Sequence, residues 1–356
     1  MKQWIEKNKP YFPAEFFIGG FVFDLVTLSR IDENFQLIQQ FVYLVVIGFL
    51  LIFEKSQRVE KWFSTGFLNK IWIYRYEVIH FLLGSLLSVY TIFYFKSASI
   101  WSSFIFIGAL SALMVLNEFE KIKGLGGFLR FSMFSLCSCS YFIYLVPIIW
   151  QHLGFFPFVF SLILSGVFYY CFFYLISKNQ NVTSRQLFVE VLTPGIIVHV
   201  LFLVLYVVRF IPPIPLSVEK MGVYHQISKQ QDQYVLQYDR PWWLFWQRGA
   251  QTFVAAPEDK IHCFVSVFAP SFFREQVKME WYLETRNGWQ KTDAIPFQIS
   301  GGRDQGFRGY TMKSRFDAGE WQVRVVTSDD REMGRIYFTV TKQELDPARE
   351  FKTEMY

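Results

Sequence analysis

Cysteine is scarce in this sequence, and the common motifs of soluble enzymes are missing. Only four cysteines occur in 356 residues. Cys263 is the single cysteine after residue 211, so the C-terminal part has no internal disulfide. Cys137 and Cys139 lack zinc-ligand spacing, and we interpret both as packing residues. No Gly-x-Ser-x-Gly, His-Glu-x-x-His or phosphate-binding-loop motif occurs. The sequence therefore indicates no metal site and no cofactor, and it favours a protein other than an enzyme without deciding the question.

Charged residues are absent from long stretches of the first 211 residues. Four uncharged stretches are each about long enough to cross the ~30 Å hydrocarbon core of a bilayer: Phe35–Phe53, Ser97–Asn117, Phe131–Ile149 and Gly154–Ser177. Three weaker spans contain an ionisable residue: Phe12–Ser29 with Asp24, Val78–Phe95 with His80, and Val191–Val208 with His199. We therefore expect residues 1–211 to form a membrane α-helical bundle of about seven transmembrane helices.

Basic residues are distributed unevenly. Through residue 211 there are 16 Lys+Arg and 11 Asp+Glu, whereas from residue 212 there are 19 of each. The balanced C-terminal part disfavours a nucleic-acid partner. Thirteen of the first 16 basic residues lie in the N-terminus and in alternate loops, and the other three are Arg30, Lys96 and Arg209. Because cytoplasmic loops are enriched in Lys and Arg, this bias predicts a cytoplasmic N-terminus. An odd number of spans then puts the C-terminal part on the other side.

The sequence pattern changes at the proline-rich stretch RFIPPIPLSVEK, Arg209–Lys220, and residues 212–227 are predicted to be a linker. Short alternating runs follow, and we expect strands at Tyr234–Tyr238, Gln251–Ala255, Ile261–Phe268, Val277–Thr285, Trp289–Asp293, Phe307–Ser314, Trp321–Thr327 and Arg335–Thr341. Asn287-Gly288 favours a type I′ hairpin turn. This pattern is typical of an all-β, immunoglobulin-like sandwich over residues 228–342. Residues 343–356 are interpreted as a charged, frayed tail.

The stretch DRPWWLFWQRG, residues 239–249, is apolar on every side. Three tryptophans, Trp242, Trp243 and Trp246, stand with a leucine and a phenylalanine in five consecutive positions. Neither face of a strand with this sequence would be polar. The stretch is therefore packed, inside the sandwich or between the sandwich and the helices, or it contacts lipid at the headgroup level, where Trp is favoured. A binding platform for a sugar is a third alternative, which the lack of polar groups in the five central positions disfavours. We favour packing for Trp243 and Trp246 over membrane contact.

Two groups of residues are candidate sites. In the glycine-rich stretch GGRDQGFRGY, Arg303, Asp304 and Arg308 could grip a carboxylate, a phosphate or a sugar. The simpler interpretation, which we favour, is a loop that opens a strand. In the membrane part, Asp24 and His199 could form a proton-handling or ligand-binding pair. Here we favour an Asp24 that reaches water and a neutral, hydrogen-bonded His199.

Four long segments carry a resemblance to a known family: IPPIPLSVEKMGVYH, DRPWWLFWQRGAQTFVAAPEDKIHCFV, GWQKTDAIPFQISGGRDQGFRGYTMK and GEWQVRVVTSDDREMGRIYFTV. Over about residues 209–342 the chain resembles the Trp/Gly/Arg-rich C-terminal domain of an uncharacterised family of bacterial multi-pass inner-membrane proteins. That domain has no known function, so the resemblance brings no catalytic residues. It implies a location in the inner membrane with a periplasmic C-terminal domain.

These observations predict a membrane-anchored envelope interaction or sensing protein that presents a periplasmic β-sandwich. Its expected partners are the lipid bilayer and an envelope protein or a glycan-like ligand, and an oligomer is left open. The alternative is a transporter or a membrane enzyme with its site in the helical bundle. A water-filled bundle interior lined by Asp24 and His199 would favour the alternative, and a dry, Phe-packed interior would favour the first hypothesis.

Overall fold

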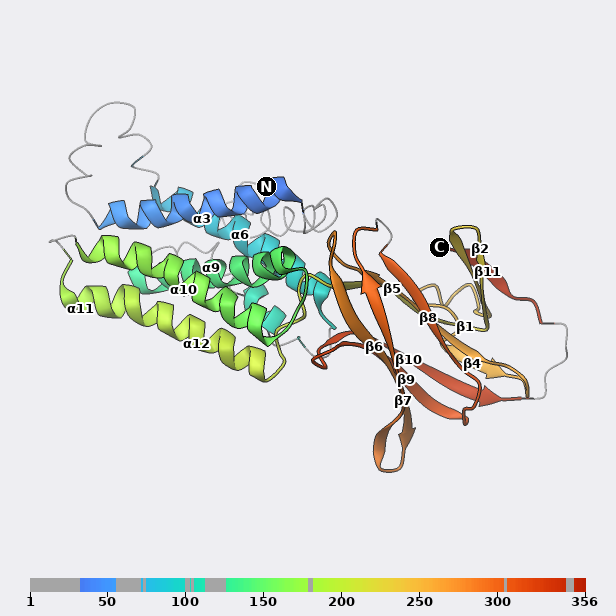
Figure 1. The fold of residues 1–356 in the computed structure, drawn as a ribbon. Coiled ribbons are helices and arrows are strands. Elements are labelled where there is room, and N and C mark those ends of the chain that lie inside the picture. Colours follow the sequence, from blue (N-terminus) through green and yellow to red (C-terminus); the bar gives the residue numbers. More distant parts are fainter. Residues whose placement is uncertain are drawn as a thin grey trace, which may run out of the picture. The chain divides into compact units, whose positions relative to one another are not determined.

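The computed structural model describes residues 33–55, 72, 75–99, 103, 106–112, 126–178, 182–303, 306–343 and 349–356. The chain divides into a helical unit that ends at Ile214 and a β unit that begins at Pro215 and also includes the short segment Lys96–Ser102 (Figure 1).

Five helical segments of the described residues are long and apolar enough to cross a membrane. They are α3 (Asn34–Glu54), α6 (Arg75–Ser97), α9 (Gly127–Trp150), α10 (Phe155–Ser177) and a continuous segment of α11 (Ser184–Gln186), the π-helix η1 (Leu187–Leu192) and α12 (Thr193–Val207). The number of such helices is thus five rather than the seven that we expected. The predicted span Phe12–Ser29 lies outside the described residues, and so does part of Ser97–Asn117, including residues 113–117.

Helix α9 is the centre of the helical unit. It packs against α3, α10 and α12. Inside the unit 78% of its apolar stretch is buried, compared with 28% for each of those three helices. Small side chains such as Ser135, Cys137, Ser138 and Cys139 allow neighbouring helices to approach α9 closely. The residues that looked suited to packing in the sequence therefore do form a packed centre.

The β unit consists of two main sheets and a smaller third one (Figure 1). The first main sheet has the order β1 (Ser217–Tyr224), β5 (Ile261–Phe268), β8 (Phe307–Lys313). The second has the order β4 (Thr252–Ala255), β10 (Glu332–Lys342), β9 (Gly319–Thr327), β6 (Arg274–Thr285), β7 (Gly288–Ser300). All neighbours are antiparallel except β4 and β10, which are parallel.

The two main sheets enclose the core of a β-sandwich. Along β6 the side chains of Val277, Met279 and Trp281 are fully buried, because alternate residues of a strand face the same side. The indole Nε1 of Trp281 donates a hydrogen bond to Thr311 Oγ1 of β8 over 3.1 Å. This buried bond links the two sheets. Every strand predicted from the sequence overlaps a strand of this unit.

The third sheet has the order β11 (Lys352–Met355), β3 (Gln233–Tyr238), β2 (Gln226–Gln230). Its core of Tyr224, Ile227, Leu236 and Phe264 packs on the outer side of β5. Three strands were not predicted. Strand β1 and the start of β2 lie in the segment expected to be a linker, and β11 lies in the segment expected to be a frayed tail. Strands β1 and β11 are stabilised by pairing with distant strands, β5 and β3, which local sequence does not reveal.

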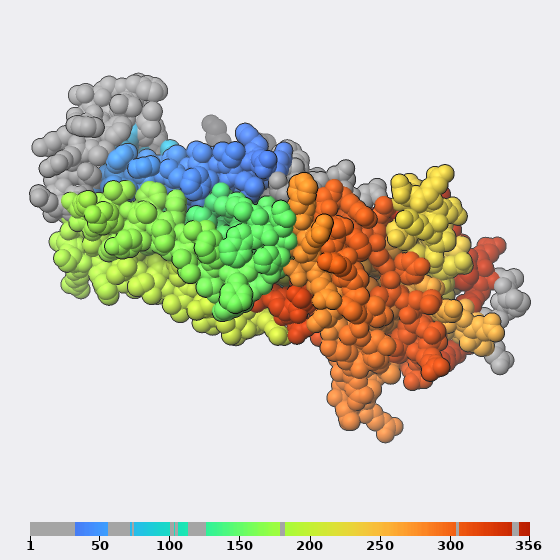
Figure 2. Space-filling view, viewed as in Figure 1, coloured from blue at the N-terminus to red at the C-terminus, as the bar shows by residue number. Residues whose placement is uncertain are grey.

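The hairpin that joins β6 and β7 projects from the body of the β unit (Figure 2). Its turn is not of type I′, because neither Arg286 nor Asn287 has a positive φ. Only Gly288 does, with φ 93°. The glycine of the Asn-Gly pair thus starts β7 in a conformation that favours glycine, rather than forming the second central residue of a primed turn.

Candidate functional site

A pocket of about 760 Å³ lies at the end of the sandwich where β4, β6, β8 and β10 end. Its volume falls within the range of small-molecule sites, ~300–1,000 Å³. The β8–β9 loop forms one wall, and its residues are Ser314, Arg315, Phe316 and Asp317. The ends of the strands supply the rest: Ala255, Ala256, Pro257, Leu283, Thr292, Lys313, Trp321, Lys342 and Gln343.

Local hydrogen bonds fix the walls of this pocket. Trp321, which is buried, donates from Nε1 to the main-chain oxygen of Asp317 over 2.9 Å and so anchors the β8–β9 loop. On the opposite wall, Ala256 and Asp259 close a turn around Pro257. The amide of Ala256 donates to Asp259 Oδ2 over 2.9 Å, and the amide of Asp259 donates to the oxygen of Ala256 over 3.1 Å. Proline at the second position of such a turn pre-sets φ.

Three cations and one carboxylate line the pocket. Lys313 is already engaged, because its ammonium contacts Asp293 and donates to Thr292 Oγ1 over 3.1 Å. Lys342 is held loosely by Asp317 over 3.8 Å, and both side chains are exposed. Within the part of the chain that the structure describes, Arg315 is exposed and has neither a hydrogen bond nor an ion pair. The pocket therefore offers free guanidinium donors and a positive surface to an anionic ligand.

Nearby, His225 marks the edge of the sandwich core. Its ring stacks on Phe253 of β4 with centroids 4.0 Å apart. Burial lowers the pKa of His225 to about 4, although Asp259, 3.9 Å from its Nδ1, opposes the shift. The imidazole is therefore neutral at neutral pH. It contributes to packing and no positive charge.

The structure does not bring the arginines of the glycine-rich loop together. The guanidinium of Arg303 lies 5.6 Å from the ring of Phe307, and that of Arg308 lies 5.6 Å from the ring of Tyr234. Because Phe307 and Arg308 are consecutive in β8, their side chains point to opposite faces. Arg308 also donates to the main-chain oxygen of Tyr356 over 3.3 Å, so it helps to hold the C-terminal strand. Asp304 lies outside the described residues.

The tryptophans of residues 239–249 are exposed. Trp242, Trp243 and Trp246 have exposed fractions of 79%, 56% and 64%. The alternative that places Trp243 and Trp246 inside the sandwich core is therefore wrong. The large rings that do fill this core are Trp281 and Trp321. Sequence alone cannot make this distinction, because a core strand and an apolar contact loop require the same residue types.

In the helical unit, His199 lies on α12 against α9. Its Nδ1 is 2.8 Å from the main-chain oxygen of Gly195 and 3.4 Å from Ser135 Oγ. This agrees with the hydrogen-bonded histidine that we favoured. Asp24 lies outside the described residues, so its pairing with His199 stays a prediction.

The interior of the bundle is not simply packed with phenylalanine. Hydroxyl groups on α9 make contacts with three other helices. Tyr94 of α6 donates to Ser140 over 3.5 Å, and Ser165 of α10 donates to Ser138 over 3.1 Å. Tyr144 donates to the amide oxygen of Gln40 on α3. The described interior thus contains several separate pairs of hydrogen-bonded polar groups on α9 and its neighbours.

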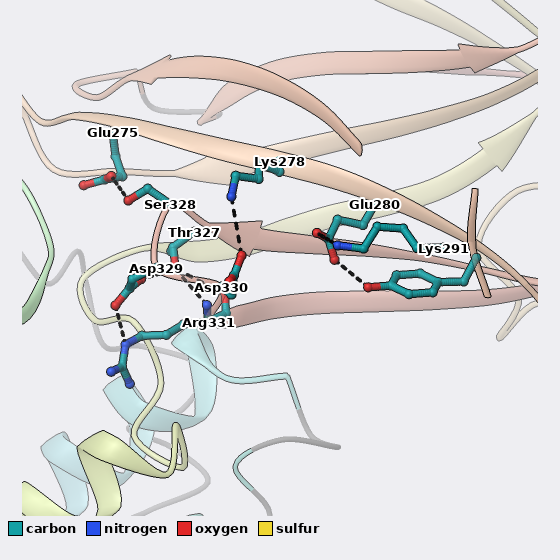
Figure 3. Close-up of polar contacts among 10 residues, drawn as sticks. Glu275, Lys278, Glu280, Lys291, Thr327, Ser328, Asp329, Asp330 and Arg331 are labelled. Atoms are coloured by element: carbon teal, nitrogen blue, oxygen red, sulfur yellow. Dashed lines mark hydrogen bonds and ion pairs between the residues drawn. The ribbon is translucent and has the colours of Figure 1, made fainter. Parts of the chain in front are cut away.

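Charged side chains around β6 and the β9–β10 turn form a separate network (Figure 3). Glu280 accepts hydrogen bonds from Lys291 over 2.6 Å and from Tyr282 over 2.7 Å. The bond to Glu280 raises the pKa of Lys291. Arg331 donates to Asp329 over 2.7 Å. Because the acidic and basic side chains of this network pair with each other, we interpret the network as structural. Its contacts stabilise the β6–β7 hairpin and the β9–β10 turn.

Sequence reasoning missed the pocket. Its residues come from six strands and two turns, and no single segment shows a recognisable spacing. The one local sign is KSRFD, Lys313–Asp317, in which two cations alternate with a serine and an aromatic residue. Among the described residues, no group of three His, Cys, Asp or Glu side chains is arranged to hold a metal ion.

Taken together, the described residues define a protein with membrane-span-capable helices and a C-terminal, mostly antiparallel β-sandwich unit. Residues 274–340, from the start of β6 into β10, match the family model described as "Protein of unknown function (DUF2914)". This domain marks an uncharacterised family, and it contains the β8–β9 wall of the pocket. No curated protein matches the chain.

Several solved structures are similar to parts of the chain. An immunoglobulin-like protein from Pseudomonas aeruginosa shares 12% identity, with 35% of this chain and 96% of that chain covered and a TM-score of 0.21. A β-glucosidase involved in saponin metabolism from intestinal bacteria shares 12% identity, with 35% and 16% covered and a TM-score of 0.23. The chain thus spans 16% of that enzyme's length. A GH3 β-glucosidase from Bifidobacterium adolescentis shares 10% identity, with 38% and 19% covered and a TM-score of 0.19. At TM-scores this low, the architecture of the β unit rests on its own strand pairing.

Proposed function

We propose that the protein is a membrane-anchored interaction or sensing module of the bacterial envelope. Its helices hold it in the inner membrane with a cytoplasmic N-terminus, and its immunoglobulin-like β unit lies in the periplasm. The uneven distribution of basic residues supports this orientation: thirteen lie in the N-terminus and alternate loops, and three elsewhere. The five membrane-capable helices support the anchoring role.

The observation that carries the function is the cationic pocket of the β unit. Arg315 and Lys342 present donors that other side chains do not occupy fully, beside the apolar surfaces of Phe316 and Leu283. A guanidinium binds a carboxylate or a phosphate through paired hydrogen bonds. The pocket volume suits a ligand of one or two sugar or amino-acid residues. The favoured ligand is therefore an anionic, glycan-like molecule of the envelope.

Two sugars that differ in one charged group provide the test. N-acetylmuramic acid and N-acetylglucosamine have the same sugar ring. The first also carries a carboxylate, whereas the second is neutral. Saturation-transfer NMR of the full-length protein in detergent should detect the acid and give a much weaker signal for the neutral sugar. A charge-assisted hydrogen bond contributes ~1.5–3 kcal/mol. Arg315→Ala should therefore weaken binding of the acid by roughly tenfold or more.

The matched control is Arg286→Ala, which removes an exposed arginine at the β6–β7 turn, outside the pocket. Its binding should equal that of the unaltered protein. Equal binding of both sugars, no binding of either, or equal loss in the two variants would refute an anion site in this pocket.

A second candidate function is a transporter or a membrane enzyme. The hydrogen-bonded polar pairs that α9 makes with neighbouring helices favour it. His199 and Ser135 are the members most suited to proton handling. If the bundle conducts protons, vesicles that contain the protein should lose an imposed pH gradient faster than empty vesicles. His199→Gln should abolish the difference. An identical decay in all three preparations would reject this candidate.

A further inference from the structure

The loop that contains the exposed tryptophans presents an apolar tip to its surroundings. Trp242 and Phe245 are 79% and 77% exposed, and Trp246 is 64% exposed. No charged side chain lies between Arg240 and Arg248. Exposed aromatic clusters of this kind mark surfaces that bind another molecule or a membrane. None of these rings lines the pocket described above.

The backbone of the loop closes its own hydrogen bonds. The amide of Leu244 donates to the oxygen of Pro241 over 3.2 Å, and the amide of Gln247 donates to the oxygen of Leu244 over 3.0 Å. The guanidinium of Arg240 donates to the oxygen of Gln247 and closes the neck. Polar backbone groups are costly to bring near hydrocarbon unless they are bonded internally. The tip therefore combines exposed rings with a backbone suited to a partly apolar medium.

Cations surround the base of the loop. Arg248 is exposed, and Lys352 donates to the main-chain oxygen of Arg240 over 2.7 Å. Three acids are near them in the sequence, Asp239, Glu350 and Glu354, and Glu354 is paired with Lys220 over 2.7 Å. A bilayer surface has anionic phosphates outside and acyl chains beneath them. The aromatic rings of the loop suit the acyl chains, and the basic residues at its base suit the phosphates. Tryptophan itself prefers the headgroup level.

We infer that this loop, residues 239–249, enters the headgroup region of the bilayer that holds the protein's own helices. The connection between the two parts of the chain indicates which membrane the loop contacts. Helix α12 ends at Val207 and β1 begins at Ser217, so a short connection keeps the β unit at a membrane surface. A tethered surface is available at high effective concentration, and a small apolar area then suffices for contact. The inference does not depend on the ligand proposed for the pocket.

Site-directed spin labelling of the full chain tests the inference. The exposed Cys171 is first replaced by serine, because the other three cysteines are buried. A nitroxide is then attached at Phe245→Cys, at the loop tip, or at Asn287→Cys, at the tip of the β6–β7 hairpin. The protein is placed in lipid discs of phosphatidylethanolamine and phosphatidylglycerol. Accessibility to oxygen and to a polar nickel chelate is measured by electron paramagnetic resonance.

Oxygen enters lipid, whereas the polar chelate is excluded from it. The ratio of oxygen to chelate accessibility should therefore be roughly fivefold or more higher at position 245 than at position 287. Trp246→Ser in the Phe245→Cys background should lower the ratio, because it removes one of the inserted rings. A label at 245 as open to the chelate as the label at 287 would overturn the inference. So would a label shielded from both reagents, which would indicate a protein contact instead.

Discussion

Two tryptophans that look alike in the sequence should respond very differently to truncation. Trp281 is fully buried in β6, bonds Thr311 across the sandwich, and meets the ring of Phe338 edge-on with centroids 6.1 Å apart. Truncation of such a residue to alanine costs ~3–5 kcal/mol. Trp246, at 64% exposure, fills no space in the core. Its truncation should change the free energy of unfolding by about 0.5 kcal/mol or less.

These free energies can be converted to melting temperatures. The β unit runs from Pro215 to Tyr356. For a unit of this size, 1 kcal/mol corresponds to roughly 3–4 °C. Trp281→Ala should therefore lower the melting temperature of the β unit by about 9–20 °C, and Trp246→Ala by about 2 °C or less. Calorimetry of the full-length protein in detergent measures both. Trp281→Phe, which keeps an aromatic ring, should give an intermediate value.

The comparison has a clear negative outcome. Equal shifts for the two alanine variants, or a larger shift for Trp246→Ala, would mean that the loop and not β6 supplies core packing. The structural assignment of the two tryptophans would then be wrong.

Three further predictions concern the β unit. Because burial lowers the pKa of His225 from 6.5 to about 4, the unfolded state binds its proton first as the pH falls. The unit should then lose up to ~3 kcal/mol of stability between about pH 6.5 and pH 4, and His225→Phe should flatten that part of the stability profile. Thr311→Val should cost ~1–3 kcal/mol, because it leaves the indole N–H of Trp281 without its acceptor; unchanged chemical denaturation would contradict this. Gly249→Ala should lower the melting temperature, since Gly249 has φ 74° and a methyl group there would collide with the main-chain oxygen of Val223; a neutral result would refute the close approach.

Local sequence was sufficient for elements that are defined by their own periodicity. Trp321, Val323 and Val325 alternate with polar residues, and they lie in β9 with their side chains buried on one face of the strand. Uncharged stretches likewise predicted α3, α9 and α10, and the weaker spans with His80 and His199 predicted α6 and the segment that contains α12, because length and hydrophobicity alone decide whether a helix can span a bilayer. Such features need no knowledge of the rest of the chain.

Long-range pairing lay beyond the sequence pattern. Strand β11 exists because Lys352–Met355 pair with Val235–Tyr238, more than one hundred residues earlier. The pocket exists because several strands end at the same level and bring Arg315 and Lys342 to one opening. Neither residue is unusual in its own segment.

The loop of residues 239–249 shows most clearly what only tertiary structure decides. Its sequence established that the segment is apolar on every side and cannot be an ordinary solvated surface. Whether its rings point into a core or out of it depends on the neck formed by Arg240 and on the bridge between Gly249 and Val223. These contacts turn the chain so that the rings face outward, because the core is already filled by Trp281 and Trp321. Hydrophobicity requires that such rings leave water, and the packing of the rest of the chain determines where they go.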